Sequence, residues 1–398
     1  MKKIKSLHAR EVLNSRGMPA VEAELNNGTS SFRAISPEGA SKGKYEAVEI
    51  KDGGHRYHGM GVKRAVENIN KIISGKLAGA ELDQRKIDKM LCALAGDRKW
   101  KLGGNATTAV SMAAWKADSP KYKSIPVPFS LIVEGGAHAG NDLAVQEFMI
   151  TPLKTGTFAE GMRAVSEIYY TLEKTVVKKY GKSASNVGYE GGFALQLNDT
   201  KTVLSLMTDA IDEAGYQKEV KIAIDAAATQ FFNGNYSIDG KIFTASGLCD
   251  YYLDLVKIFP VFSIEDPFHE EDFASFAMLK KRAKRLMVVG DDLTVTNVQR
   301  IKKATDSCNA LIVKVNQVGT VTEALEAVEL ARKDGWEIIV SHRGGDSEDT
   351  FISDFSANIG AFGAKFGAPM RGERTAKYNQ LLRLEENGLP YAGKKFKL

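Results

Sequence analysis

Between residues 221 and 367 the sequence repeats one pattern six times: KIAID (221–225), VFSIED (261–266), MVVGDD (287–292), LIVKVN (311–316), EIIVSHR (337–343) and AKFGAP (364–369). Each run joins apolar residues to charged or titratable ones. From Asp225 these polar positions follow at intervals of 40, 26, 23, 28 and 23 residues, which is the length of a strand, a helix and two connections. Strands buried on both faces read as continuous apolar runs of this kind. The pattern predicts a parallel α/β barrel, whose active site gathers at the C-terminal ends of the strands.

The N-terminal region predicts a separate α+β domain. VEAEL (21–25) alternates polar and apolar residues, a turn sequence follows, and SFRAI (31–35) resumes the alternation, so an antiparallel hairpin is expected. A polar, glycine-containing loop, PEGASKGKYE (37–46), comes next. Apolar residues at helical spacing then predict three helical segments, at residues 62–73, 81–96 and 105–116.

Three prolines within residues 117–128 mark a domain boundary. We therefore expect an N-terminal α+β domain of residues 1–120 and a catalytic barrel domain of residues 121–398. After the boundary, two apolar runs flank a glycine-rich loop, and the second run is expected to end at residues 146–148. Amphipathic spacing predicts helices at 158–180 and 201–214.

The composition is that of an ordinary globular protein, with 43% hydrophobic and 26% charged residues in a chain of 398. A net charge of +5 suits an anionic substrate. The densest basic run, at 280–285, lies where a helix should precede the strand at Met287. We interpret it as a solvated helix face and expect no nucleic-acid partner.

Cysteine usage and the N-terminal sequence indicate the compartment. Cys92, Cys249 and Cys308 are too few and too widely spaced for a disulfide framework or a zinc site, which favours a reducing, cytoplasmic environment. The first residues, MKKIKSLHAR, lack the apolar core of a signal peptide. No run approaches the roughly 18 apolar residues of a membrane span, so none is expected.

Three carboxylates stand at successive predicted strand ends: Asp225, Glu265 and Asp291. Hard divalent cations prefer oxygen ligands, and three carboxylates leave coordination positions for water and substrate. A single acidic residue of this kind would more often be an exposed or helix-capping group. Three of them at neighbouring strand ends predict a Mg²⁺ site.

Two lysines belong to the same strand ends. Lys314 lies within the apolar run LIVKVN, and lysine is seldom buried without a functional reason. A buried lysine near other cations falls in pKa and can act as a base; the alternative is a lysine that extends its ammonium group to solvent. Lys365 is expected to hold a substrate carboxylate and to lower the pKa of Lys314.

Two further carboxyl groups, Glu147 and Glu190, lie beside glycine-rich or polar loops on the other side of the predicted barrel. Elimination of water needs a base that removes the proton next to a carboxylate and an acid that protonates the departing hydroxyl. The two glutamates are candidates for the acid side. His138 and His342 fall in strand-end loops, and Arg343 can form a fork for phosphate or carboxylate.

The chain closely resembles the enolase family over nearly its full length. The resemblance rests on long, specific stretches: AREVLNSRG (9–17), PEGASKG (37–43), AVQEFMI (144–150), VGYEGGFA (187–194), SIEDPF (263–268), VVGDDLTVTN (288–297), IVKVNQVGT (312–320), VSHRGGDSEDTF (340–351) and GAPMRGERTAKYNQLLR (367–383). It implies an N-terminal α+β domain on an eight-stranded α/β barrel, a homodimer or higher homo-oligomer, and two Mg²⁺ ions, the second bound with substrate. The implied activity is Mg²⁺-dependent dehydration of 2-phosphoglycerate to phosphoenolpyruvate, a lyase reaction of glycolysis. For that superfamily a Lys or His base and a Mg²⁺-stabilised ene-diolate are already established.

Position by position, the resemblance implies a role for each candidate. Three carboxylates would hold the first metal ion: Asp225, Glu265 and Asp291. Ser41, in the glycine-containing loop, would help to hold the second ion as that loop closes. Lys314 would be the base and Glu190 the acid, with Glu147 supporting it. The implied substrate-binding residues are Ser41, His138, Gln146, His342, Arg343 on the phosphate, Gly344, and Lys365 on the carboxylate.

The chain departs from the family at several positions near these residues. The family usually has Asp in place of Tyr189, and Ser in place of Gly344, which removes a hydroxyl group from the expected phosphate site. It usually has Asn in place of Glu134 and Thr in place of Lys42. The departures delete none of the expected metal ligands and leave the base in place.

Two other functions stay open on the sequence. The same fold could dehydrate or epimerise a different carboxylic acid through a similar ene-diolate. Alternatively, a catalytically impaired paralogue could bind a partner through its basic C terminus, KKFKL (394–398). Arg343 and the loop at 37–46 favour a phosphorylated substrate, and a short basic tail is usually only solvated.

Overall fold

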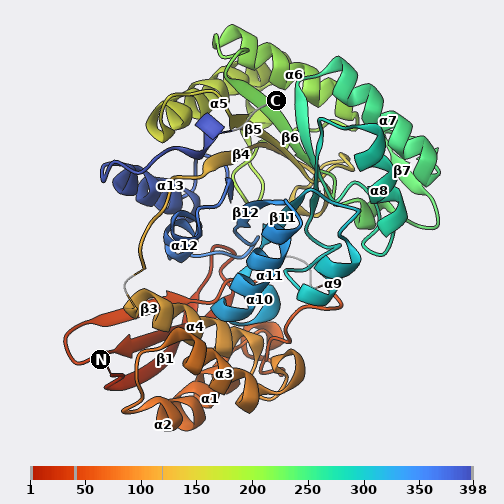
Figure 1. The fold of residues 1–398 in the computed structure, drawn as a ribbon. Helices are drawn as coiled ribbons and strands as arrows, with labels where there is room; N and C mark the ends of the chain where they lie inside the picture. The colour runs from red at the N-terminus through yellow and green to blue at the C-terminus, as the bar shows by residue number, and fades with distance from the viewer. Residues whose placement is uncertain (1–2, 40–42, 119, 396–398) are drawn as a thin grey trace.

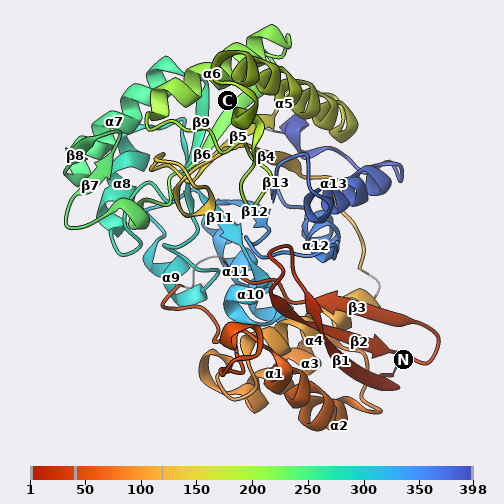
Figure 2. The ribbon, with the colours of Figure 1, turned by 180° about the vertical axis from the view of Figure 1, so that it is seen from behind.

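The computed structural model describes residues 3–39, 43–118 and 120–395. The chain forms an N-terminal α+β part, red to orange in Figure 1, and a larger barrel part, yellow to blue. The view from behind shows the short helix α10 (Val315–Val318) and α11 (Val321–Lys333) of the barrel part beside the N-terminal helices (Figure 2).

The N-terminal part contains an antiparallel sheet in the order β1–β2–β3. Its strands are β1 (Ser6–Leu13), β2 (Pro19–Asn26) and β3 (Ser31–Ile35). The predicted hairpin is confirmed, because Glu24 pairs with Arg33 across β2 and β3. The helices are α1 (Lys63–Asn68), α2 (Ser74–Leu77), α3 (Gln84–Ala95) and α4 (Gly104–Ala117), with a π-helical turn at Ile69–Ile73.

Helix α4 lies between the sheet and the barrel and is buried along its whole length except at Lys116. Its alanines and threonines let neighbours approach from every side, as expected for a helix that is not amphipathic. Several polar contacts join the parts at the start of α11. The Thr322 N–H donates to Asp88 Oδ2 at 2.8 Å, and Lys99 Nζ lies 2.8 Å from Glu323 Oε1.

Eight strands close into a barrel in the order β10–β11–β12–β13–β4–β5–β6–β9. This confirms the eight-stranded α/β barrel. The strands are β4 (Val127–Glu134), β5 (Glu147–Pro152), β6 (Val220–Asp225), β9 (Val261–Glu265), β10 (Met287–Gly290), β11 (Ala310–Val313), β12 (Glu337–Ser341) and β13 (Gly363–Gly367).

The prediction that the barrel is parallel is wrong at one strand. β5 runs antiparallel to both β4 and β6, whereas the other neighbours are parallel. The loop between β4 and β5 contains no crossover helix, and parallel neighbours generally need one. The second apolar run therefore begins at Glu147 rather than ending there. As a result Glu147 pairs with Glu134 and Asp225, which are the last residues of β4 and β6.

Helices surround the barrel, and a small hairpin, β7 (Tyr236–Ile238) and β8 (Lys241–Phe243), lies outside it. The prediction of a helix at 158–180 is confirmed, and Thr157 and Glu160 form a capping box at its start. Among the helices of the described residues, none combines the length and apolar character that crossing a membrane requires. The outer helices are α5 (Phe158–Tyr180), α6 (Thr200–Glu213), α7 (Ala245–Ile258), α8 (Phe273–Arg282), α9 (Val298–Lys303), α12 (Phe351–Ile359) and α13 (Gly372–Glu385).

Candidate active site

One cavity at the mouth of the barrel collects nearly all of the predicted site residues. Glu265 lies at the same strand end, paired in register with Asp225. Ser41 lies outside the described residues, so its predicted roles stay predictions. The predicted residues that line the cavity are His138, Gln146, Glu147, Glu190, Asp225, Asp291, Lys314, His342, Arg343, Gly344 and Lys365.

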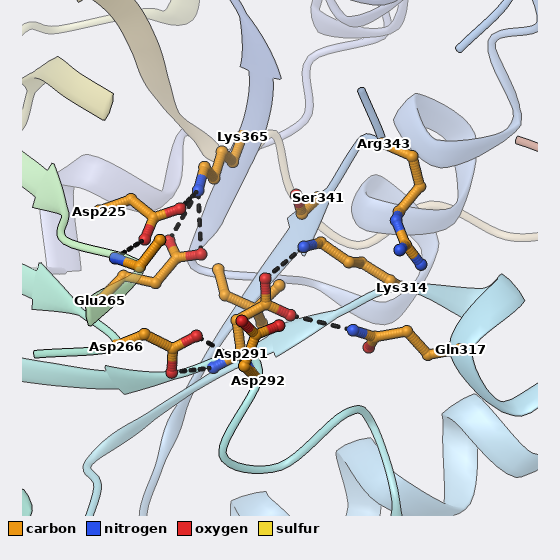
Figure 3. A network of polar contacts seen from close by, with 12 residues as sticks. Asp225, Glu265, Asp266, Asp291, Asp292, Lys314, Gln317, Ser341, Arg343 and Lys365 are labelled. Carbon is orange, nitrogen blue, oxygen red and sulfur yellow. Dashed lines mark hydrogen bonds and ion pairs between the residues drawn. The ribbon is translucent and has the colours of Figure 1, made fainter. Parts of the chain in front are cut away.

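Lys365 forms the centre of a buried ionic cluster (Figure 3). Its Nζ lies 2.9 Å from Asp225 Oδ2, 2.9 Å from both carboxylate oxygens of Glu265, and 3.3 Å from Glu147 Oε1. Burial alone would lower the pKa of Lys365, but the surrounding carboxylates raise it well above its usual value. Burial and the Asp225 charge raise the pKa of Glu265. Three carboxyl groups thus share one ammonium group in this cluster.

Lys314 follows β11 directly and forms an ion pair with Asp291 (Figure 3). The Gln317 side-chain N–H donates to the other Asp291 oxygen at 3.1 Å. The pKa of Lys314 was expected to fall, and the structure corrects this. Burial and the nearby Arg343 and Lys365 charges do lower it, but the surrounding carboxylates, Asp291 first and then Glu265, together raise it above its usual value.

Asp266 supports this arrangement, and the sequence did not predict its role. It has a left-handed backbone conformation, with φ of 41°, and its carboxylate accepts the N–H groups of Asp291 at 3.0 Å and Asp292 at 2.7 Å. One oxygen from each of these three aspartates lies within 4.8 Å of the others. In the sequence, the only indication of a role for Asp266 is that it follows Glu265 directly at the end of the apolar run VFSIED (261–266).

The acid side of the cavity combines Glu190 and Glu147 with two histidines. His342 Nε2 lies 2.8 Å from Glu190 Oε2, and His138 Nδ1 lies 3.7 Å from Glu190 Oε1 and 3.9 Å from Glu147 Oε1. Burial raises the pKa of Glu147 to about 8. Burial alone would also raise the pKa of Glu190, but His342 and His138 lower it overall. The two carboxyl groups therefore differ strongly in their affinity for a proton.

Arg343 is buried and already engaged by the N-terminal part. Its Nη1 donates to Glu46 Oε2 at 3.0 Å and to Asn316 Oδ1 at 3.1 Å, and its Nη2 donates to Glu46 Oε1 at 3.3 Å. Glu46 belongs to the loop that the sequence indicated for substrate, but its contact with Arg343 was not predicted. Arg374 fixes the same segment by donating to the carbonyl groups of Arg343 and Gly344 at 3.0 and 3.1 Å.

Two family models match the chain. The model described as "Enolase, N-terminal domain" covers residues 4–127, and "Enolase, C-terminal TIM barrel domain" covers residues 122–398. The chain belongs to the enolase family. Its resemblance to that family, first drawn from motifs, is therefore confirmed over almost the whole sequence.

Curated relatives named enolase agree with this assignment. The enolase of Methanocaldococcus jannaschii is 47% identical over 415 residues, covering 99% of this chain and 98% of the relative. That of Methanococcoides burtonii is 47% identical over 404 residues, covering 96% and 95%. The enolase of Pyrococcus furiosus is 46% identical over 415 residues, covering 98% and 96%.

Of the positions expected to depart from the family's usual residues, Tyr189, Gly344 and Glu134 lie within the described residues. Tyr189 is exposed, and the Arg16 guanidinium lies 5.0 Å from the centre of its ring. Gly344 lines the cavity. Glu134 is fully buried beside Glu190. Lys42 lies outside the described residues.

Proposed function

We propose that this chain is a hydro-lyase that dehydrates 2-phosphoglycerate to phosphoenolpyruvate. One observation carries the proposal: a single cavity combines a largely buried lysine, Lys314, with a fully buried carboxyl group, Glu190, from a different segment. Elimination of water from a hydroxy acid needs a base and an acid acting on one substrate. Membership of the enolase family supports the same reaction.

Each residue then has a defined task. Lys314 removes the proton from the carbon next to the carboxylate, and the electrons of that bond form an ene-diolate. Glu147, whose pKa is raised to about 8, supplies a proton to the neighbouring Glu190, and Glu190 passes it to the hydroxyl on the neighbouring carbon, which leaves as water while the double bond forms. Arg343 binds the phosphate and Lys365 the carboxylate side. His138, Gln146 and His342 line the substrate.

Asp225, Glu265 and Asp291 are proposed to hold a divalent cation, Mg²⁺. The donor set supports this, because carboxylate oxygens are the ligands that Mg²⁺ prefers. The position of the Lys365 ammonium group, 2.9 Å from both Asp225 and Glu265, indicates that these carboxylates attract positive charge. When bound there, the ion would supply charge that stabilises the ene-diolate. A second Mg²⁺ is proposed to bind with substrate, with Ser41 among its ligands.

The direct test is an assay of the purified protein with 2-phosphoglycerate. We expect phosphoenolpyruvate to form with Mg²⁺, formation to stop when EDTA removes the metal, and activity to return when Mg²⁺ is restored. Failure to form it in the presence of Mg²⁺, combined with turnover of a different hydroxy acid, would assign the site to that other substrate.

Gly344 leads to a prediction about substrate affinity. A phosphate at Arg343 lacks the hydroxyl donor that a serine would supply, and a hydrogen bond to a charged group contributes about 1.5–3 kcal/mol. We expect Gly344→Ser to lower KM for 2-phosphoglycerate by about 10- to 100-fold. The kcat should stay nearly constant, since the phosphate keeps its charge through the reaction. Steady-state kinetics measures both values, and an unchanged KM would argue against phosphate binding beside Gly344.

Three broader features are also proposed. The domain boundary falls near residue 120, which is supported by family models that meet at residues 122–127. The three cysteines are free, and this supports a reducing, cytoplasmic location. A homodimer is proposed from family membership, and light scattering of the purified chain would measure its mass.

A further inference from the structure

Glu134 is a buried acid with no place in the reaction described above. It is the last residue of β4, is 0% exposed, and pairs in register with Glu147. It also lies beside His138 and Glu190, and one ligand-type atom from each of the three lies within 4.8 Å of the others. Its backbone is fixed by the strand, so its side chain reaches the Glu190 segment from a rigid position.

The Glu134 side chain holds the backbone of Glu190. The Glu190 N–H donates to Glu134 Oε1 at 2.6 Å, and the Glu190 carbonyl accepts the Ala368 N–H at 2.9 Å. The His342 contact at 2.8 Å fixes the carboxylate itself. The Glu190 N–H is therefore held by a side chain, whereas the Glu190 carbonyl is held by a backbone N–H. Removing the Glu134 side chain leaves the Glu190 N–H without this acceptor.

The turn that carries Glu190 is shaped around Glu134. A Cβ atom on Gly188 would lie 1.7 Å from Glu134 Oε2 and 2.8 Å from the His138 carbonyl oxygen, and a Cβ on Gly192 would lie 2.9 Å from Glu134 Cγ. Gly188 N–H donates to the Gly192 carbonyl at 2.9 Å, which closes the turn. These glycines leave the room that the glutamate side chain fills.

The charge state of Glu134 is compatible with this position. Burial and the neighbouring Glu190 charge raise the pKa of Glu134 to about 9. A neutral carboxyl group adds no second negative charge beside Glu190 at neutral pH. Its Oε1 atom can accept the Glu190 N–H in the neutral form, so an amide of the same shape can replace it.

We propose that Glu134 is a positioning residue that holds Glu190 in place for protonation of the leaving hydroxyl. The inference rests on the proposed dehydration. It assigns Glu134 to the acid half of the reaction and not to proton abstraction at Lys314. Small displacements of a catalytic group cost on the order of 100-fold in rate, so the effect should be large and confined to one step.

The test follows exchange of the substrate α-proton with solvent and net dehydration in the same samples. We expect Glu134→Ala to lower the kcat for dehydration by about 10- to 100-fold, with KM within about twofold and exchange largely retained. Glu134→Gln should have a kcat for dehydration within a few-fold of the wild-type value, because the glutamine keeps the acceptor for the Glu190 N–H.

A matched control separates positioning from loss of packing. Val133, the preceding residue of β4, is also fully buried. Val133→Ala should lower the melting temperature without changing the ratio of exchange to dehydration. Equal loss of exchange and dehydration in Glu134→Ala would overturn the proposal. The proposal would also fail if Glu134→Ala kept the wild-type ratio of exchange to dehydration and only its melting temperature fell.

A double-mutant cycle tests the same contact from the turn. Gly188→Ala should reduce dehydration in the unchanged protein, because its Cβ would collide with Glu134 Oε2. The additional reduction should be smaller in the Glu134→Ala background, where part of that collision is absent. Equal effects in both backgrounds would overturn the proposal. Failure of the unchanged protein to dehydrate 2-phosphoglycerate would instead reject the proposed function.

Discussion

Replacing Lys314 with alanine is expected to abolish exchange of the 2-phosphoglycerate α-proton with solvent. Removal of a general base typically costs about 10²–10⁴-fold or more. Metal binding should remain, because Asp225, Glu265 and Asp291 are all retained. Exchange is measured by isotope incorporation into recovered substrate, and metal binding is measured by titration calorimetry with Mg²⁺.

The alternative for Lys314 is a purely structural role as the counter-ion of Asp291. Lys314→Met keeps an unbranched side chain of nearly the same length but cannot accept a proton, so it should lose exchange as completely as the alanine variant. The exposed Lys303→Ala provides a control that should leave exchange unaffected. Persistent exchange in a folded Lys314→Met protein would assign the base to another residue.

Glu190→Gln is expected to have the complementary effect. The amide keeps the size of the side chain but cannot donate a carboxyl proton to the departing hydroxyl group. Net dehydration should fall by about 10²–10⁴-fold, whereas α-proton exchange at Lys314 should be largely spared. Rapid-quench measurement of phosphoenolpyruvate together with isotope exchange gives both rates from one preparation.

The two variants therefore separate the halves of the reaction. If Glu190→Gln loses exchange as severely as dehydration, Glu190 acts on both steps or the whole site is disturbed. Glu134→Gln is a useful comparison, since it changes a carboxyl group to an amide on the neighbouring residue and is expected to keep both rates. A large loss in Glu134→Gln would show that a carboxyl proton at that position is needed as well.

The arrangement of charges explains why the lysines carry raised pKa values in this structure. Lys365 contacts Asp225 and Glu265, and Lys314 contacts Asp291, so each ammonium group has a carboxylate counter-ion. An opposite charge at contact distance raises the pKa of a lysine more than distant cations lower it. The base function proposed for Lys314 therefore requires that Asp291 exchange the Lys314 ammonium group for another positive charge, such as the proposed Mg²⁺.

Much of the fold was determined by local sequence pattern. The runs ending near Asp225, Glu265 and Asp291 were recognisable because strands covered on both faces carry apolar residues at nearly every position. The C-terminal strand ends of such a barrel face one mouth, so the convergence of these carboxylates with Lys314 and Lys365 followed from the same pattern. Family-specific motifs added the expected roles of the individual residues.

Other features were decided only by the tertiary structure. An apolar run has the same composition whichever way its strand runs, so the reversed direction of β5, and with it the pairing of Glu147 with Asp225, left no local signal. The pKa of Lys314 depends on Asp291, 23 residues away in sequence, and the engagement of Arg343 depends on Glu46, almost 300 residues away. Such pairings are fixed by distance and burial in the folded chain, because a charge interaction depends on spatial separation and desolvation and not on sequence order.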